Sequence, residues 1–154
     1  MKPDCYSQIY LHFVIVVSHR EYLLHDKQQK EVFPFMCGLI NSMGHKSLAV
    51  NGAPNHVHIL IGFKPDKAPS ETIKEIKRAT TNFINSKGWY LGRFQWQPGY
   101  GVFSYSRSSI DNVINYIKNQ KEHHKVKTFR DEYLELLRKF DLEYNERYLF
   151  EFFD

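Results

Sequence analysis

The sequence predicts an α+β protein with a ferredoxin-like, split β-α-β fold, in which one antiparallel sheet carries two helices on one face. Three observations predict it. The segments follow the order strand, helix, strand, strand, helix, strand; two segments have apolar residues at helical spacing; and only a turn separates the middle strands. A further C-terminal helix carries a tyrosine, Tyr116. We expect one domain over 1–154, with a core of about 8–125 and a helical tail of about 126–154.

The first half of the chain supplies a strand, a helix and a hairpin. Residues 8–19 (QIYLHFVIVVSH) are β-branched and aromatic, with apolar residues on both alternating faces, which is typical of a central strand. Residues 26–44 show helical spacing and end at a glycine. Residues 45–55 predict a short strand followed by an Asn-Gly turn signal, and residues 56–63 predict the return strand.

The second half supplies the remaining elements. Residues 68–88 predict a helix with isoleucines on its apolar side, and residues 102–106 predict a short strand after an aromatic, glycine-rich stretch. Residues 109–125 predict one continuous helix with a packing stripe of isoleucine and valine. Residues 129–153 are charged and leucine-rich and predict a terminal helix and tail.

Composition narrows the class of protein. The 154 residues are 42% hydrophobic and 25% charged, which is typical of a globular domain rather than a disordered chain. The longest apolar run is far shorter than the roughly 20 residues that a membrane span needs, and the N-terminus lacks an apolar signal core. We therefore expect a cytoplasmic protein whose two cysteines are free thiols. A net charge of +4 permits a nucleic-acid partner without requiring one.

Two histidines interrupt the apolar strand NHVHILIGF. Because side chains alternate along a strand, His56 and His58 share a face with Leu60, whereas Val57 and Ile59 share the face that should pack on the helices. The histidine face is expected to be open, which would place two imidazoles side by side. Taken alone, such a pair most often represents ordinary surface histidines, and a metal site would need further ligands.

Three chemistries use such a pair. A histidine-triad hydrolase needs a third histidine where this chain has Leu60, so that chemistry is excluded. A two-histidine phosphoesterase needs a second, distant His-x-Thr/Ser element, and neither HKS (45–47) nor SHR (18–20) fits that pattern well. Metal-assisted strand cleavage by a tyrosine needs a tyrosine helix elsewhere. Tyr116 and Gln120 are four residues apart on the predicted helix and therefore lie on one strip of its surface.

This ordered set resembles the single-tyrosine HUH transposases, which include the small transposases of single-stranded insertion sequences and the REP-associated tyrosine transposases. The similarity covers roughly residues 8–124: the His-Val-His strand, the tyrosine in YIKNQ, and the flanking segments NHVHILI and WQPGYGVFSYS. It implies a divalent ion, Mg²⁺ or Mn²⁺, bound by His56, His58 and Gln120. It implies Tyr116 as a nucleophile that forms a 5′-phosphotyrosine, with hairpin-ended single-stranded DNA as substrate. It also implies a homodimer, with the tyrosine acting in cis or in trans.

Candidate DNA contacts are less specific. Lys74, Lys77 and Arg78 occupy neighbouring turns of one predicted helix, and Arg107 and Lys121 are weaker candidates. Such basic clusters are also routine on solvated helix faces. Two other functions stay open: a non-catalytic ferredoxin-like module that binds nucleic acid, and a metal-dependent phosphoesterase.

Overall fold

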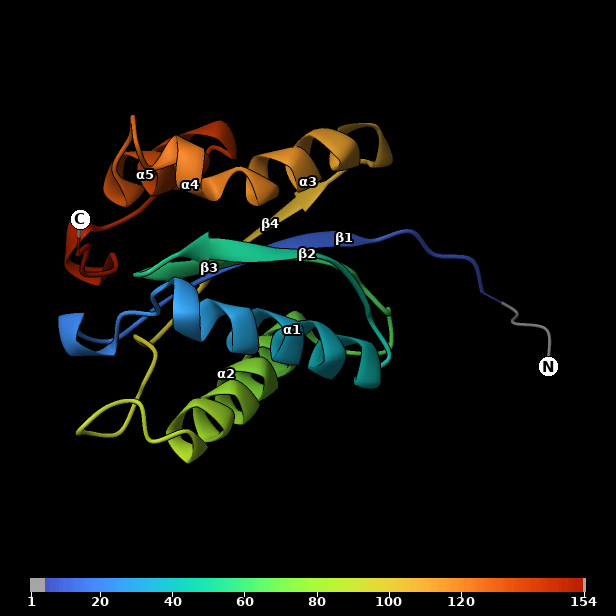
Figure 1. The fold of residues 1–154 in the computed structure, drawn as a ribbon. Helices are drawn as coiled ribbons and strands as arrows, with labels where there is room; N and C mark the ends of the chain where they lie inside the picture. The colour runs from blue at the N-terminus through green and yellow to red at the C-terminus, as the bar shows by residue number, and fades with distance from the viewer. Residues whose placement is uncertain (1–4, 154) are drawn as a thin grey trace.

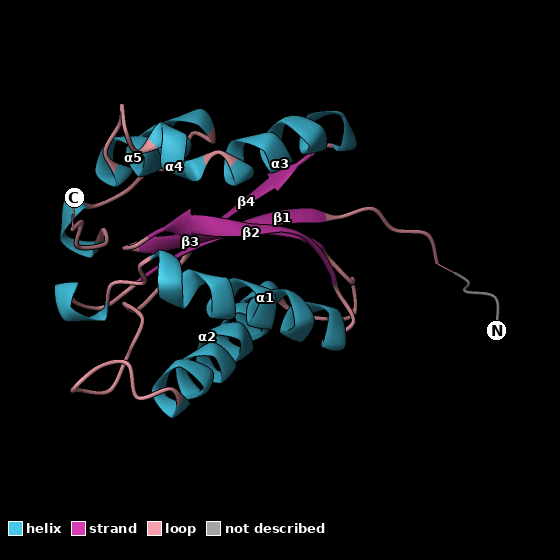
Figure 2. Cartoon of the chain, viewed as in Figure 1, coloured by secondary structure: helices cyan, strands magenta, loops and turns pink. Residues whose placement is uncertain are grey.

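A four-stranded antiparallel sheet forms the centre of the computed structural model, which describes residues 5–153. The strands are ordered β2-β3-β1-β4 and form one layer (Figure 2). Their bounds are β1 (Tyr10–Val16), β2 (Lys46–Ala53), β3 (His56–Gly62) and β4 (Gly101–Tyr105). This order, with a helix after β1 and another after β3, confirms the predicted ferredoxin-like arrangement.

Helices α1 (Asp26–Ser42) and α2 (Pro69–Ser86) cover one face of the sheet (Figure 1). The main core lies between them and the sheet, and it takes alternate residues of β1 and β3, such as Ile15, Val57 and Ile59. The face predicted to be apolar on β3 is therefore the one that packs on these two helices.

The opposite face of the sheet is covered as well. Helices α3 (Ile110–Lys118), α4 (Gln120–His123) and α5 (Phe129–Lys139) lie across it (Figure 1). Leu60 packs there with the isoleucine and valine stripe of α3, and Val14 and Val16 pack on α5. The expectation of an open histidine face was therefore wrong, because the leucine-rich C-terminal segment folds back as a second helical layer.

The helix predicted over 109–125 is interrupted. Asn119 ends α3 with φ −98° and ψ 23°, and α4 begins at the next residue. The side-chain amide of Asn51, on β2, donates to the carbonyl oxygens of Ile117 and Lys118, each at 3.0 Å. These carbonyls belong to the last turn of α3, so a side chain outside the helix satisfies them where the helix stops. Tyr116 and Gln120 consequently lie on either side of a break.

The β2–β3 turn also differs from the prediction. The pairing continues through Asn51 and Gly52, and the turn is formed by Pro54 and Asn55. A Cβ atom at position 52 would lie 2.1 Å from the carbonyl oxygen of His56, so only glycine allows this close pairing of the strands. The Asn51-Gly52 pair therefore lies within β2 and does not form the turn.

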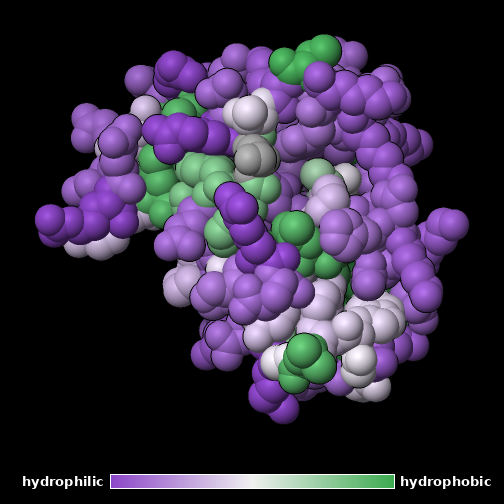
Figure 3. All heavy atoms as spheres, turned by 60° about the vertical axis from the view of Figure 1, so that its left-hand side comes forward, coloured by the Kyte–Doolittle hydropathy of each residue, from purple (hydrophilic) through white to green (hydrophobic). Residues whose placement is uncertain are grey.

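Short 3₁₀ turns and a C-terminal strap complete the fold. The turns are η1 (Arg20–Tyr22), η2 (Arg107–Ser109) and η3 (Glu146–Tyr148). After α5 the chain returns along the molecule, where Phe150 and Phe152 pack against α5. Over residues 5–153, no helix is both long enough and apolar enough to cross a membrane. On the face drawn in Figure 3, apolar side chains form limited patches within a mostly hydrophilic surface.

Candidate metal centre and tyrosine site

The two histidines of β3 point into the second helical layer, and both are fully buried. Their strand lies next to β1 with Val16 opposite His56 and Val14 opposite His58. His12 of β1 lies opposite Leu60 and is also fully buried on this face. Strand alternation thus gathers three imidazoles beneath α3, α4 and α5.

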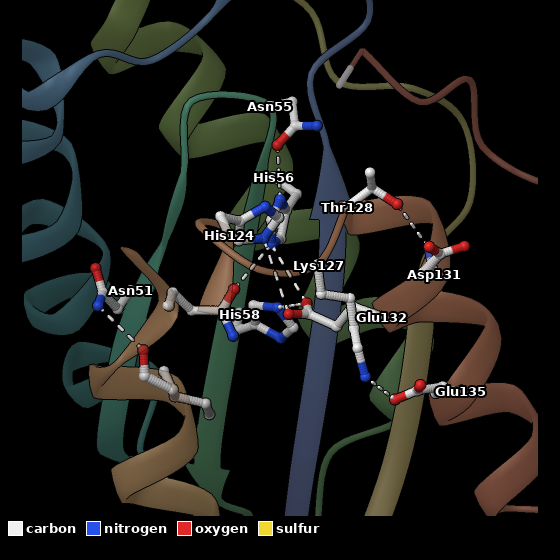
Figure 4. A network of polar contacts seen from close by, with 12 residues as sticks. Asn51, Asn55, His56, His58, His124, Lys127, Thr128, Asp131, Glu132 and Glu135 are labelled. Atoms are coloured by element: carbon white, nitrogen blue, oxygen red, sulfur yellow. Dashed lines mark hydrogen bonds and ion pairs between the residues drawn. The ribbon is translucent and has the colours of Figure 1, made fainter. Parts of the chain in front are cut away.

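His56 is held in one orientation by its neighbours. Its Nδ1 lies 2.7 Å from Asn55 Oδ1 (Figure 4), and its ring stacks on Phe129 with centroids 3.8 Å apart and planes at 5°. An Nδ1–H donated to the Asn55 oxygen leaves Nε2 directed at Gln120 Oε1, 3.1 Å away. The lone pairs of these two atoms then face the same space, which suits a shared cation.

His58 belongs to a chain of four hydrogen-bonded groups, of which three are buried and the fourth, Tyr105, is half-buried. Its Nε2 lies 2.8 Å from Glu132 Oε1, and its Nδ1 lies 2.7 Å from His12 Nε2. His12 Nδ1 lies 3.3 Å from the Tyr105 hydroxyl. Burial lowers the pKa of His58 to about 4 and lowers the pKa of His12 well below its usual value, so both rings are neutral. His58 then donates from Nε2 to the carboxylate, and His12 donates from Nε2 to His58 Nδ1.

Glu132 comes from α5 and is 5% exposed. Its Oε1 also lies 3.6 Å from His56 Nε2. Burial would raise the pKa of this carboxyl, but the neighbouring imidazoles of His56 and His58 outweigh burial and hold the pKa well below its usual range. The group is therefore a carboxylate, and it supplies negative charge to the histidine cluster.

The cluster fits a divalent metal ion. One ligand atom from each of His56, His58 and Glu132 lies within 4.8 Å of the others, and all three residues are buried. Separations near 3 Å between such atoms are what two ligands about 2.0–2.2 Å from one ion produce. Gln120 adds a neutral oxygen beside His56. Two imidazoles suit transition metals, whereas the carboxylate and amide oxygens suit Mg²⁺ or Mn²⁺.

Tyr116 lies at the edge of this cluster, on α3. Its ring contacts His58 edge to face with centroids 5.7 Å apart, and His123 with centroids 5.0 Å apart. Burial, reinforced by the charge of Glu132, raises the pKa of the Tyr116 hydroxyl far above its usual value. The phenol is therefore protonated at neutral pH and would need help to lose its proton.

The structure brings together the four predicted site residues, which are His56, His58, Tyr116 and Gln120. Two buried neighbours, Glu132 and His12, were not predicted. Glu132 belongs to a helix remote in sequence, and among the many acidic residues of that segment nothing distinguishes it. The sequence does contain a signal for His12, because His12 is an imidazole in an otherwise apolar strand, and His56 and His58 share that feature. Strand register would have placed it beside them.

The predicted basic cluster on α2 lies on the other side of the sheet from the histidines. Lys77 donates to the carbonyl oxygens of Gln97 and Gly99, at 2.8 and 2.6 Å, and burial lowers its pKa to about 8. Arg78 pairs with Glu75 on the same helix, and Lys74 is exposed. The structure does not bring these three residues to the tyrosine site.

The two weaker candidates lie in the second layer. Arg107, in η2, is 3.9 Å from Asp111, and Lys121, in α4, is 2.9 Å from Asp26 of α1. All four side chains are exposed, so these ion pairs contribute little to stability and leave both cations accessible to a phosphate.

Lys77 is expected to stabilise the fold. Lys77→Met would leave two backbone carbonyls without their donor, so the free energy of unfolding should fall by about 1–3 kcal/mol in urea titrations. Lys74→Met, on the exposed side of the same helix, should change it by less than about 0.5 kcal/mol. Equal stability of the two variants would contradict the structural role of Lys77.

Comparisons with known proteins give the family and agree with the fold. The model of a family described as IS200-like transposases matches residues 5–120. A Deinococcus radiodurans R1 protein whose structure is described as that of a candidate transposase is similar, with 21% identity and a TM-score of 0.60 over 78% of this chain and 96% of its own. A REP-associated tyrosine transposase bound to a REP hairpin has 17% identity and a TM-score of 0.59, over 80% of this chain and 74% of its own. No curated protein matches the chain.

Proposed function

Because the chain belongs to the IS200-like transposase family, we propose that it cleaves and rejoins single-stranded DNA through a covalent bond to Tyr116. The observation that carries the proposal is the contact between the Tyr116 ring and His58, at the edge of a buried cluster suited to a metal ion. A nucleophile beside a cation site is the arrangement that phosphoryl transfer requires.

His56, His58, Glu132 and Gln120 would hold the ion, Mg²⁺ or Mn²⁺. When bound, it would supply Lewis acidity to the scissile phosphate. Asn55 and His12 orient the imidazoles from behind. His56 keeps its proton on Nδ1, toward Asn55, and with the ion bound His58 would carry its proton on Nδ1 instead of Nε2 and donate it to His12 Nε2. Both Nε2 atoms would then be free to coordinate.

Tyr116 would attack phosphorus, so that an oxygen–phosphorus bond forms at the phenol and the bond to the 3′ oxygen breaks. The phenol gives up its proton and the departing 3′ oxygen takes up one, so the products are a 5′-phosphotyrosine and a free 3′-OH. The phosphotyrosine conserves the bond energy of the phosphodiester. A second 3′-OH could therefore displace the tyrosine and rejoin the strand without ATP.

Hairpin-ended DNA is the substrate that we propose, in line with the REP hairpin bound by the structural neighbour. We also propose a homodimer. Tyr116 contacts His58 of its own chain, so each protomer has the parts of a cis site. Gel filtration and light scattering should give a dimer, and a monomer with full cleavage activity would overturn this part of the proposal.

The central experiment looks for the covalent product. The protein is incubated with end-labelled single-stranded oligonucleotides that carry the hairpins flanking its gene, with Mg²⁺, Mn²⁺ or EDTA. We expect an adduct on denaturing gels in metal only, and mass spectrometry should place the nucleotide on the peptide that contains Tyr116. Binding without cleavage in every metal would indicate a non-catalytic module. Turnover of small phosphodiesters without an adduct would indicate a phosphoesterase.

His12 is expected to act as a positioning residue for His58. His12→Phe keeps a ring in the strand but removes the partner of His58 Nδ1, so Mn²⁺ affinity measured by calorimetry should fall about 10–100-fold. The ¹⁵N shifts of His58, recorded with diamagnetic Mg²⁺, should show that metal binding no longer fixes its proton on Nδ1. His45→Phe, a buried histidine outside the cluster that bonds Thr72, serves as the control and should leave Mn²⁺ affinity unchanged. Unchanged affinity in His12→Phe would refute this role.

A further inference from the structure

A groove of about 580 Å³ runs between α3 and α5 over the end of β4. Tyr116 and Glu132 both line it, so the groove reaches the tyrosine side of the histidine cluster. Its volume lies within the roughly 300–1,000 Å³ of small-ligand sites. The groove therefore offers room next to the nucleophile for something about the size of a nucleotide.

The walls of the groove combine apolar and polar groups. Val113 of α3 and Leu136 of α5 contribute apolar surface, and the ring of Tyr105 contributes a flat aromatic one. Ser109 and Asn112, on the α3 side, contribute hydrogen-bonding side chains. An unpaired base has the same two properties, since its faces are apolar and its edge carries donors and acceptors.

The groove is lined by two lysines and two glutamates, and one of the lysines, Lys139, is not paired with either carboxylate. Lys127 pairs with Glu135 at 2.6 Å. Lys139 is exposed, and its ammonium lies over the rings of Tyr105 and Phe140, 5.6 and 5.8 Å from their centroids. Within residues 5–153, no carboxylate lies within ion-pair distance of Lys139. An uncompensated cation beside an aromatic floor suits a phosphate attached to a stacked base.

We propose that this groove binds one unpaired nucleotide adjacent to the scissile phosphate, with its base between α3 and α5 and a backbone phosphate at Lys139. The proposal rests on the proposed function in one respect, because Tyr116 at the groove fixes which phosphate lies nearby. A paired base would bring its complementary strand against the helices, so the groove selects a flipped-out or single-stranded nucleotide.

The first test measures binding of a 12-nucleotide oligothymidylate by fluorescence anisotropy in EDTA, where metal-dependent cleavage cannot interfere. Lys139→Gln should raise the Kd about fivefold and reduce the salt slope of log K by about 0.7, the contribution of one phosphate contact. Arg138→Gln, one residue earlier on α5 and outside the groove, should change both quantities much less. Equal effects of the two variants would overturn the proposal.

The second test fills the groove. Asn112 is exposed on α3 and lines the groove, so Asn112→Trp should occupy the space of the base without disturbing the core and raise the Kd about tenfold. Asn115→Trp, on the same helix but outside the groove, is the matched control. Thermal melts of both variants should match that of the unmodified protein. Wild-type affinity in a folded Asn112→Trp protein would refute base binding here.

A third measurement separates a base site from an anion site. The dinucleotide dTpdT should shift the methyl signals of Val113 and Leu136 in NMR spectra, whereas inorganic phosphate alone should not. Equal shifts with inorganic phosphate would reject the nucleotide proposal. An adduct that forms normally in Asn112→Trp would refute the groove while leaving Tyr116 as the nucleophile. Binding of dTpdT in the groove without any adduct would refute the proposed strand cleavage by Tyr116 and leave the groove as a nucleotide-binding site.

Discussion

Tyr116→Phe should abolish the covalent protein–DNA adduct, with a loss of about a thousandfold or more in the rate of single-strand cleavage. The change removes one oxygen and keeps the ring that packs against His58 and His123. DNA binding and the thermal unfolding midpoint should therefore stay close to their wild-type values. The measurement is adduct formation on denaturing gels with Mn²⁺, beside an anisotropy titration of the same oligonucleotide.

The environment of Tyr116 explains why so large an effect is expected. Burial and the carboxylate of Glu132 raise the pKa of the phenol, so the hydroxyl does not ionise unaided near neutral pH. Cationic charge in the cluster would offset Glu132 and favour the phenolate. Adduct formation should thus depend on metal as strongly as it depends on the hydroxyl itself.

Tyr105→Phe is the matched control. Tyr105 lines the same groove, and burial raises its pKa to about 12, but its hydroxyl bonds to His12. Removing it should keep adduct formation within about tenfold of wild type, as expected for a group behind the metal ligands. An adduct that persists in Tyr116→Phe and disappears in Tyr105→Phe would move the nucleophile to Tyr105.

Local patterns predicted the elements that position the site. Alternation along β3 separated His56 and His58 from Val57 and Ile59, and the two sets lie on opposite faces in the structure. The order of strands and helices then predicted the sheet. These inferences succeed because side-chain direction in a strand and apolar spacing in a helix depend on near neighbours in sequence.

Long-range contacts explain why the sequence did not predict the helix break at Asn119 or the place of Glu132 in the histidine cluster. The break at Asn119 is accompanied by Asn51 bonds to carbonyls 66 and 67 residues away, which no helical pattern contains. Glu132 reaches the histidines only because α5 folds over the sheet, and the sequence of α5 reads as an ordinary charged helix. Glu132 also lies outside residues 5–120, the range that matches the family model.

The basic residues of α2 show what charge in the sequence leaves out, namely the contacts that each side chain makes in the fold. Lys77 was predicted to contact a phosphate, but its ammonium donates hydrogen bonds to two backbone carbonyl oxygens. Lys139, on α5, was not predicted at all, although it lies at the groove beside the tyrosine. Whether a lysine is available to DNA depends on its partners in the fold, and those partners are remote in sequence.

Metal binding should raise the thermal unfolding midpoint of the protein through the histidine cluster. At a Mn²⁺ concentration about one hundred times the Kd, binding to the folded state alone adds about 2.7 kcal/mol, which corresponds to a Tm increase of about 5–10 °C for a chain of this size. His58→Asn should lose that increase, because the ion loses a ligand and Glu132 loses its closest partner. His19→Asn, an exposed histidine outside the cluster, should keep it.

Glu132→Gln tests whether the carboxylate coordinates the ion or only anchors His58. A neutral amide is a weaker ligand than a carboxylate, so Mn²⁺ affinity should fall at least about tenfold, which removes about 1.4 kcal/mol and roughly half of the Tm increase. The midpoint without metal must be compared first, because the unmodified carboxylate is buried against both histidines. A larger Tm increase in Glu132→Gln than in wild type would mean that the carboxylate competes with the metal for the imidazoles. Glu132 would then block the site instead of completing it, and the ligand set would reduce to His56, His58 and Gln120.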